Sequence, residues 1–295
     1  AGPDAGWLSL EDMNRGTALF GEAEAAVAGD QTLLDRVRRA RIPLDHQWLR
    51  GHVRYRLEAD ESGKPFAGPA DLRAATEEFI ARVTAYEGPG IRVDGANSRE
   101  EYATALRLRA DSIANPPELP EQFRGIATGG LVDIQEGDFS LAMGGTLQPD
   151  AKASNGHAAV MDPAVLCWSV QYRGIGLQIP EGRWRVYASV RCEKVRDAGV
   201  AFTGGIYHEG MRRNLVGLSV RLEDGGQPQN VDPNTSTETI VTPPKGAGNG
   251  EYQLYDFGTH DLDSQSYVWF GTTGGVSAEN VKAIYVDRLI FVKEQ

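Results

Sequence analysis

The sequence predicts an α+β protein of two domains, with a small α-helical bundle at residues 1–120 followed by an antiparallel, jelly-roll-like β-sandwich at residues 121–295. Residues 1–113 carry apolar side chains at helical spacing, whereas residues 125–295 carry short alternating runs between Gly-, Asn-, Asp- and Pro-rich turns. The stretch 114–124, which holds three prolines, joins the two regions. We therefore expect an exposed linker or an extended strap there, and a sandwich that folds alone.

Four helices are expected in the first region. A capping-box pattern begins at Ser9, with an acidic residue three positions later, and a second begins at Ser98. Pro43 should kink the second helix, because proline removes a backbone donor and crowds the preceding turn. The moderate length of the connections favours a small antiparallel bundle. The helical stripes cover residues 9–27, 33–53, 69–86 and 98–113.

The second region alternates most clearly at residues 182–192, where Trp184 and Cys192 share one parity and Arg183 and Arg191 share the other. That alternation predicts a half-buried antiparallel strand. The Gly-, Pro-, Asn- and Thr-rich residues 225–250 predict a long surface loop. The other expected strands lie at 130–136, 139–143, 165–172, 175–179, 199–207, 214–223, 252–257, 266–272 and 281–293.

Composition excludes several classes of protein. The net charge of −11 would repel a polyanion, so we expect no nucleic-acid partner. No run approaches the roughly 20 apolar residues of a membrane span, so no membrane partner is expected. The two cysteines cannot form a zinc site, although Cys167 and Cys192 can pair if their strands are neighbours. No signal peptide is visible at the start of the chain.

Two stretches resemble known carbohydrate-active proteins. Residues 8–55 resemble the helical end of a bacterial glycoside-hydrolase-like family related to α-glucuronidases, in which this pattern follows a catalytic barrel that this chain does not contain. The matching runs are Phe20-Gly21-Glu22-Ala23-Glu24, Arg36-Val37-Arg38-Arg39-Ala40-Arg41-Ile42-Pro43-Leu44-Asp45 and Trp48-Leu49.

The second resemblance is to a β-sandwich carbohydrate-binding module appended to such enzymes. It implies a secreted or periplasmic polysaccharide-degrading system, with a polysaccharide or oligosaccharide and the catalytic domain of the parent protein as partners. The matching runs are Asn155-Gly156-His157-Ala158-Ala159-Val160-Met161, Trp168-Ser169-Val170-Gln171, Gly182-Arg183-Trp184-Arg185-Val186-Tyr187 and Tyr285-Val286-Asp287-Arg288-Leu289-Ile290-Phe291.

Sugar binding needs flat aromatic side chains that stack on C–H faces and polar groups that bind hydroxyls. Core packing is the competing interpretation of each aromatic residue. We expect the carbohydrate-binding residues among Asn155, His157, Trp168, Tyr172, Arg173, Tyr207, His208, Arg212, Tyr267 and Trp269.

Modules of the resembled type often hold a structural Ca²⁺ between the first and last strands. Calcium prefers six to eight oxygen ligands. The side chains that could supply some of these oxygens are Asp133, Gln135, Glu136, Asp138 and Asp287.

The sequence favours a non-catalytic carbohydrate-binding region of a modular polysaccharide-degrading enzyme, because no paired carboxylates sit in a recognisable glycosidase pattern. No catalytic residue is therefore assigned. A stand-alone hydrolase or lyase is the first alternative, with His157, Tyr207 and His208 moving protons. A structural or protein-interaction module is the second. Glycan affinity without turnover separates the favoured class from both alternatives.

Overall fold

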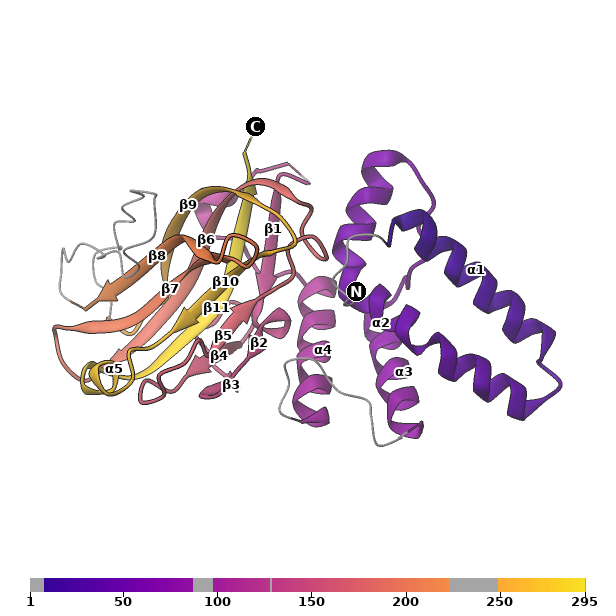
Figure 1. Ribbon diagram of the computed structural model, residues 1–295, viewed down its shortest axis with the longest axis horizontal. Coiled ribbons are helices and arrows are strands. Elements are labelled where there is room, and N and C mark those ends of the chain that lie inside the picture. Colours follow the sequence, from indigo (N-terminus) through magenta and orange to yellow (C-terminus); the bar gives the residue numbers. More distant parts are fainter. Residues whose placement is uncertain (1–7, 87–97, 128, 223–248, 295) are drawn as a thin grey trace.

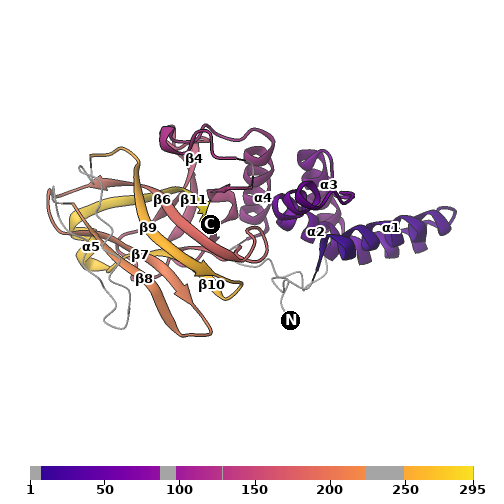
Figure 2. The same cartoon turned by 90° about the horizontal axis from the view of Figure 1, so that it is seen from above.

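The helices and the strands form two lobes that lie side by side. The structure is a computed structural model that describes residues 8–86, 98–127, 129–222 and 249–294. In Figure 1 helix α4 lies against the β-sandwich and α1 lies farthest from it. Figure 2, seen from above, shows the same order of the helices. The α+β class and the order of its parts are thus confirmed.

Each of the four long helices begins after a side-chain cap. Ser9 accepts the Asp12 N–H and completes the predicted capping box, and Ser98 accepts the Glu101 N–H. The third helix starts after Asp71 rather than at Pro69, because the Asp71 carboxylate accepts the Ala74 N–H. The helices are α1 (Leu10–Ala26), α2 (Gln31–Ser62), α3 (Leu72–Ala85) and α4 (Arg99–Ala114), and Pro43 lies inside α2 without ending it.

Helix α2 is the centre of the helical lobe, because it contributes to two small apolar clusters. Trp48 packs with Leu10 and Met13 of α1 in one cluster. The next residue, Leu49, packs with Phe79 of α3 and Leu106 of α4 in the other. Successive residues on a helix point about 100° apart, so adjacent large side chains let α2 hold α1 on one side and α3 and α4 on the other.

The sandwich consists of two antiparallel sheets. The six-stranded sheet has the order β3-β4-β11-β6-β9, with β1 also paired to β11. Its strands are β1 (Leu131–Gln135), β3 (Gly145–Pro149), β4 (His157–Met161), β6 (Gly182–Lys194), β9 (Gln253–Leu262) and β11 (Val281–Lys293). The five-stranded sheet has the order β2-β5-β10-β7-β8. Its strands are β2 (Ser140–Leu141), β5 (Val170–Tyr172), β7 (Val200–His208), β8 (Arg213–Arg221) and β10 (Ser266–Gly271).

The short helices of the second region are η1 (Glu121–Phe123), η2 (Glu136–Asp138) and α5 (Gly275–Asn280). The predicted alternation of β6 is confirmed on its inner face, since Trp184 and Cys192 are buried in the core between the sheets. The outer face is exposed at Arg183 but not at Arg191, which is buried and paired with Asp150, so the strand is half-buried only in its first part. Strands β3 and β4 were not predicted. The expected strand at 175–179 is only an isolated bridge between Ile175 and Ile179. The predicted loop at 225–250 falls almost entirely on residues 223–248, outside the described residues.

The two lobes are packed against one another. Gly137 of η2 lies so close to α4 that a β-carbon there would stand 2.7 Å from the Arg109 backbone nitrogen and 2.8 Å from the Ala105 oxygen. Arg54 of α2 donates to the Gly176 carbonyl at 2.6 Å. The connecting segment 115–120 is held on the sandwich by a bond from Arg288 to the Glu118 carbonyl. It is therefore a strap rather than a free linker.

Both cysteines are free thiols in this structure. Cys192 lies on β6 of the six-stranded sheet, whereas Cys167 precedes β5 of the five-stranded sheet, so the two positions are not on neighbouring strands. Burial raises the pKa of the Cys192 thiol to about 12, so this thiol remains protonated at physiological pH. None of the helices in the described ranges is long and apolar enough to cross a bilayer.

Candidate functional site

An aromatic cluster lies on the outer face of the five-stranded sheet. On β10, Val268 and Phe270 belong to the core, so Tyr267 and Trp269 point to the opposite face. Tyr207 of β7 is paired with Tyr267 in register, and their ring centroids are 5.5 Å apart. The strand pairing thus brings together aromatic residues that are sixty positions apart in the sequence.

Trp168 covers this cluster from the loop before β5. Its ring centroid lies 5.4 Å from that of Trp269 and 6.1 Å from that of Tyr207. Trp168 is 45% exposed, whereas Trp269 is 4% exposed. Trp269 therefore lies buried beneath Trp168, and Trp168 is the indole that a ligand can reach. We call Trp168, Tyr207, Tyr267 and Trp269 the aromatic face.

Two glycines leave room for the Trp269 and Trp168 rings, and one amide binds Trp269. A β-carbon on Gly205 would come within 2.9 Å of the Trp269 indole nitrogen, so only glycine leaves room for the ring. That nitrogen donates to Asn214 Oδ1 at 2.9 Å. Gly271 has a similar role beneath Trp168, since its β-carbon would lie 3.1 Å from Trp168 Cδ1. The ring positions are therefore set by the backbone as well as by neighbouring side chains.

Polar groups border the aromatic face. The Arg173 guanidinium lies 3.9 Å from the Tyr267 ring centroid and donates to Glu209 at 2.6 Å and to Gln171 at 2.8 Å. Gln171 in turn donates to the Trp168 carbonyl at 3.1 Å. Burial raises the pKa of Tyr267, so its hydroxyl stays protonated. Aromatic surface beside amide and guanidinium groups suits a ligand that presents both C–H faces and hydroxyls.

Three other predicted carbohydrate-binding residues do not belong to the aromatic face. Tyr172 is a core residue, 1% exposed, because it is paired with Val268 and shares its inward direction. His208 is buried and bonded to Asp263, and it accepts the Met211 N–H. Arg212 lies in the β7–β8 turn with a φ of 52°. The sequence could not separate Tyr172 from Trp269, since parity does not say which side of a strand faces the core.

Asn155 and His157 lie on the other side of the sandwich, near α4. Asn155 donates to Ser112 of α4 at 3.0 Å and to the Glu136 carboxylate at 2.9 Å. His157 lines a hollow of about 220 Å³ together with Asp111 and neighbouring residues. The structure thus brings together Trp168, Arg173, Tyr207, Tyr267 and Trp269, and it leaves Asn155 and His157 apart from them.

Some of the expected calcium ligands lie close together, because β1, which carries Asp133, pairs with β11, which carries Asp287. Asp133 and Asp287 interact, but each has protein partners: Arg288 binds Asp133 at 3.1 Å, and Ser154 donates to Asp287 at 2.8 Å. Burial raises the pKa of Asp133 to about 6 and that of Glu136 to about 7. Burial disfavours the charged form of both groups, and the charge that Asp133 keeps is paired with Arg288.

The remaining candidate ligands do not complete a calcium cage. Gln135 accepts from Ser154 and donates to Asp133. Asp138 faces the helical lobe, where it pairs with Arg109 and accepts from Gln178. In the described part of the chain, no group of three or more His, Cys, Asp or Glu side chains is arranged to hold a metal ion. These side chains do not fit a calcium cage, since Arg288 already supplies the positive charge beside Asp133 and Asp287.

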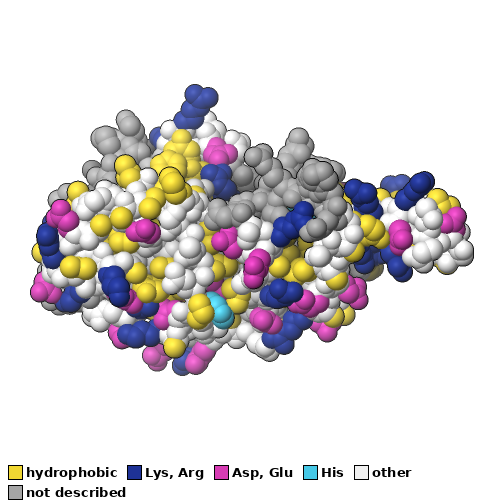
Figure 3. All heavy atoms as spheres, turned by 90° about the horizontal axis from the view of Figure 1, so that it is seen from below, with side chains coloured by type: hydrophobic (Ala, Val, Ile, Leu, Met, Phe, Trp, Pro, Cys, Tyr) yellow, Lys and Arg dark blue, Asp and Glu magenta, His cyan; other side chains and the backbone are white. Residues whose placement is uncertain are grey.

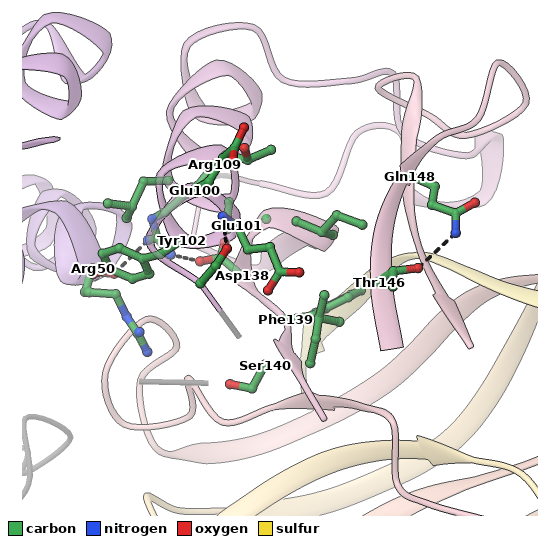
Figure 4. Close-up of a pocket in the computed structure, with 17 residues that line it drawn as sticks. Arg50, Glu100, Glu101, Tyr102, Arg109, Asp138, Phe139, Ser140, Thr146 and Gln148 are labelled. Carbon is green, nitrogen blue, oxygen red and sulfur yellow. Dashed lines mark hydrogen bonds and ion pairs between the residues drawn. The ribbon is translucent and has the colours of Figure 1, made fainter. Parts of the chain in front are cut away.

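A cavity of about 470 Å³ lies between the helical lobe and the sandwich (Figure 4). Four segments that are distant in the sequence line it: Arg50 of α2, residues 98–109 of α4 and its cap, residues 137–141, and residues 146–148. The sequence did not single out this cavity, because none of these segments carries a recognisable motif by itself.

The inner end of the cavity contains a buried ion pair. Arg109, 3% exposed, pairs with Asp138 and donates to the backbone carbonyls of Leu49 and Arg50 at 3.0 and 2.7 Å. Burial, and then the charge of Arg50, lowers the pKa of Arg109 to about 9. Nearby, the Tyr102 hydroxyl contacts His46 Nε2, and burial followed by Arg50 and Arg109 lowers the pKa of His46 to about 4.

The underside of the molecule carries charges of both signs. Figure 3 shows basic and acidic side chains interspersed with hydrophobic ones over this face, in the part of the chain that the structure describes. A protein that follows a phosphate backbone instead gathers its basic side chains in one stripe. The expectation of no nucleic-acid partner stays a prediction from the net charge.

No protein-family model and no curated protein sequence matches the chain. Among solved structures, it is similar to the CBM22-1 and GH10 modules of Clostridium thermocellum endo-1,4-β-D-xylanase 10B, complexed with xylohexaose, at 9% identity and a TM-score of 0.30. That match covers 58% of this chain and 27% of the xylanase chain, about a quarter of its length.

Two further structures are similar. The CBM22-1 xylan-binding domain of Paenibacillus barcinonensis Xyn10C matches at 8% identity and a TM-score of 0.32, over 56% of this chain and 95% of that domain. A carbohydrate esterase of Shiga toxin-encoding bacteriophage phi24B matches at 10% identity and a TM-score of 0.36, over 55% and 98% of the two chains. Structural similarities with TM-scores this low do not indicate a function. The relation to α-glucuronidases stays a prediction.

Proposed function

We propose that this chain is a non-catalytic carbohydrate-binding region and that the aromatic face is its binding surface. The observation that carries the proposal is Trp168, an exposed indole supported from below by Trp269 and flanked by Tyr207. An indole held in this way can stack on the C–H face of a sugar at little cost in side-chain entropy. Arg173 and Gln171 lie at its border, where the hydroxyls of a bound sugar would need partners.

The finer parts of the proposal come from the resemblances in the sequence. They favour a polysaccharide or oligosaccharide as the ligand, a glycoside hydrolase as the parent protein, and a secreted or periplasmic location. In this arrangement the helical lobe braces the sandwich against a catalytic domain. The contacts of α4 with η2 support that role, since they fix the sandwich relative to the helices.

A stand-alone hydrolase or lyase is less well supported. Its three expected proton-transfer residues are not assembled: His157 lies on the six-stranded sheet, Tyr207 lies on the five-stranded sheet, and His208 is bonded to Asp263. We expect no reducing sugar to be released from glycans by this chain. Reproducible release that His157→Ala or Tyr207→Phe abolishes would instead support an enzyme.

The test is isothermal titration of the full chain with a panel of soluble polysaccharides and their oligosaccharides. Trp168→Ala should weaken binding by about 1–3 kcal/mol, the usual loss at a binding hot spot. Leu166→Ala is the matched control, because Leu166 is 77% exposed in the same loop and does not join the aromatic cluster. Cooperative unfolding of each variant shows that the fold survives. Undiminished binding by Trp168→Ala would place the site elsewhere, and affinity for no glycan would favour an interaction module.

A further inference from the structure

The cavity between the lobes has the size and the chemistry of a small-molecule site. Its volume of about 470 Å³ falls in the range of known ligand pockets, about 300–1,000 Å³. Apolar side chains such as Phe139 and Leu147 line it together with Ser140, Thr146 and Gln148. Its sandwich side is lined by residues of β2 and β3, whereas the aromatic face is formed mainly by β10 and β7 with the loop before β5. No residue of the aromatic face lines the cavity, although Ser140 of the cavity is paired in register with Gln171 at the border of that face.

Arg50 is the unusual residue of this cavity. Its Nε is fully buried and has no hydrogen-bond partner, and within the described ranges no carboxylate lies in ion-pair distance of its guanidinium. The deepest acid of the cavity, Asp138, is already paired with Arg109. Figure 4 shows dashed lines between Arg109 and Asp138, and none reaches the guanidinium of Arg50.

A guanidinium that is partly removed from water and has no counter-ion costs free energy. The positive charge of Arg50 also acts on its surroundings, since it contributes to the lowered pKa values of Arg109 and His46. Arg50 therefore brings to the cavity a positive charge with which no described carboxylate forms an ion pair, although Glu100 and Glu101 also line the cavity. An unpaired guanidinium is complementary to an anionic group.

We propose that the cavity binds a carboxylate-bearing ligand of monosaccharide size, with the carboxylate paired to Arg50. Because Nε is buried, the two terminal nitrogens of the planar guanidinium are the donors left to form two parallel hydrogen bonds with a carboxylate. Glu100 and Glu101, which are both exposed, also line the cavity, and their negative charge opposes a dianion such as sulfate more strongly than a single carboxylate. Ser140, Thr146 and Gln148 offer polar contacts to hydroxyl groups. This site does not depend on the aromatic face.

The test compares D-galacturonate with D-galactose by isothermal titration of the full chain, because the two sugars differ only in the carboxylate. We expect galacturonate to bind at least tenfold more tightly and to raise the midpoint of thermal unfolding. Arg50→Gln should remove that preference. Arg39→Gln, an exposed substitution on the same helix, should leave it intact.

Additional ligands and variants identify what the cavity recognises. Acetate should bind more weakly than galacturonate, and inorganic sulfate should not compete with it. Equal affinity for the two sugars, or galacturonate binding that Arg50→Gln leaves unchanged, would overturn the proposal. If sulfate bound as tightly as galacturonate, the cavity would not be selective for a carboxylate. If acetate bound as tightly, the cavity would recognise the carboxylate without the sugar ring. Trp168→Ala should not affect galacturonate, so failure here and failure at the aromatic face are distinguishable.

Discussion

At the scale of single residues, burial decides the chemistry of Glu136. This side chain is fully buried, and both of its oxygens accept from Asn155. Desolvation is the largest cause of its raised pKa, and Asp287 and Asp133 add to it. The folded protein therefore holds a proton on Glu136 at pH values where the unfolded chain has lost it.

This shift predicts a pH dependence of stability. The folded pKa is about 7 and the unfolded value is 4.5, so the contribution of Glu136 is complete below pH 4.5 and is lost as the pH rises through 7. Relative to Glu136→Gln, the wild type should lose about 1–3 kcal/mol of unfolding free energy between pH 4 and pH 8. Urea denaturation at both values measures the difference. A difference that is the same at both values would show that Glu136 ionises normally in the folded state.

Gly137 is a second residue on which a contact depends. Alanine there would drive its β-carbon into backbone atoms of α4, which cannot move aside as a flexible side chain can. We expect Gly137→Ala to lower the unfolding free energy by about 1–3 kcal/mol, a typical cost of overpacking.

The control for this substitution is Gly29→Ala. A β-carbon at Gly29 would meet no atom within 4 Å, so that variant should change stability by less than about 0.5 kcal/mol. Equal stabilities of the two variants in guanidinium denaturation would mean that α4 does not press on η2 in solution.

At the scale of elements, the pairing of β1 with β11 determines what lies between the first and last strands. It brings Asp133 opposite Ile290 and places Arg288 beside it, so that a guanidinium balances the acids there. We therefore expect neither added calcium nor EDTA to move the midpoint of thermal unfolding. A rise with calcium that EDTA reverses would show that these carboxylates rearrange into a cage.

At the scale of the whole molecule, the sandwich has its own core, yet the helical lobe adds to it. Val53 and Leu57 of α2 pack against that core, and Arg109 of α4 pairs with Asp138. A fragment of residues 125–295 should still unfold cooperatively, but at a lower midpoint than the full chain. A fragment of residues 98–295, which keeps α4, should recover part of the loss. A broad, non-cooperative transition of the shorter fragment would mean that the sandwich is not an independent domain.

Several elements could be predicted because their signals are local. The caps Ser9 and Ser98 lie next to the backbone groups that they bind, and the alternation of β6 is visible within eleven residues. Strands β3 and β4 could not be predicted in this way. Pro149 and Gly145 weaken the alternating hydrophobic pattern of β3. This strand lies at the edge of its sheet, where its only partner is β4.

The sequence by itself determined the fold class, the positions of most helices and strands, and the set of aromatic residues from which the aromatic face is drawn. Only the tertiary structure decided which of those residues face outward, since that depends on which side of each strand the other sheet covers. It also decided that Asp138 pairs with Arg109 and that Arg50 has no described counter-ion. The physical reason is that desolvation and pairing of charges depend on packing between segments, which no local pattern in the sequence records.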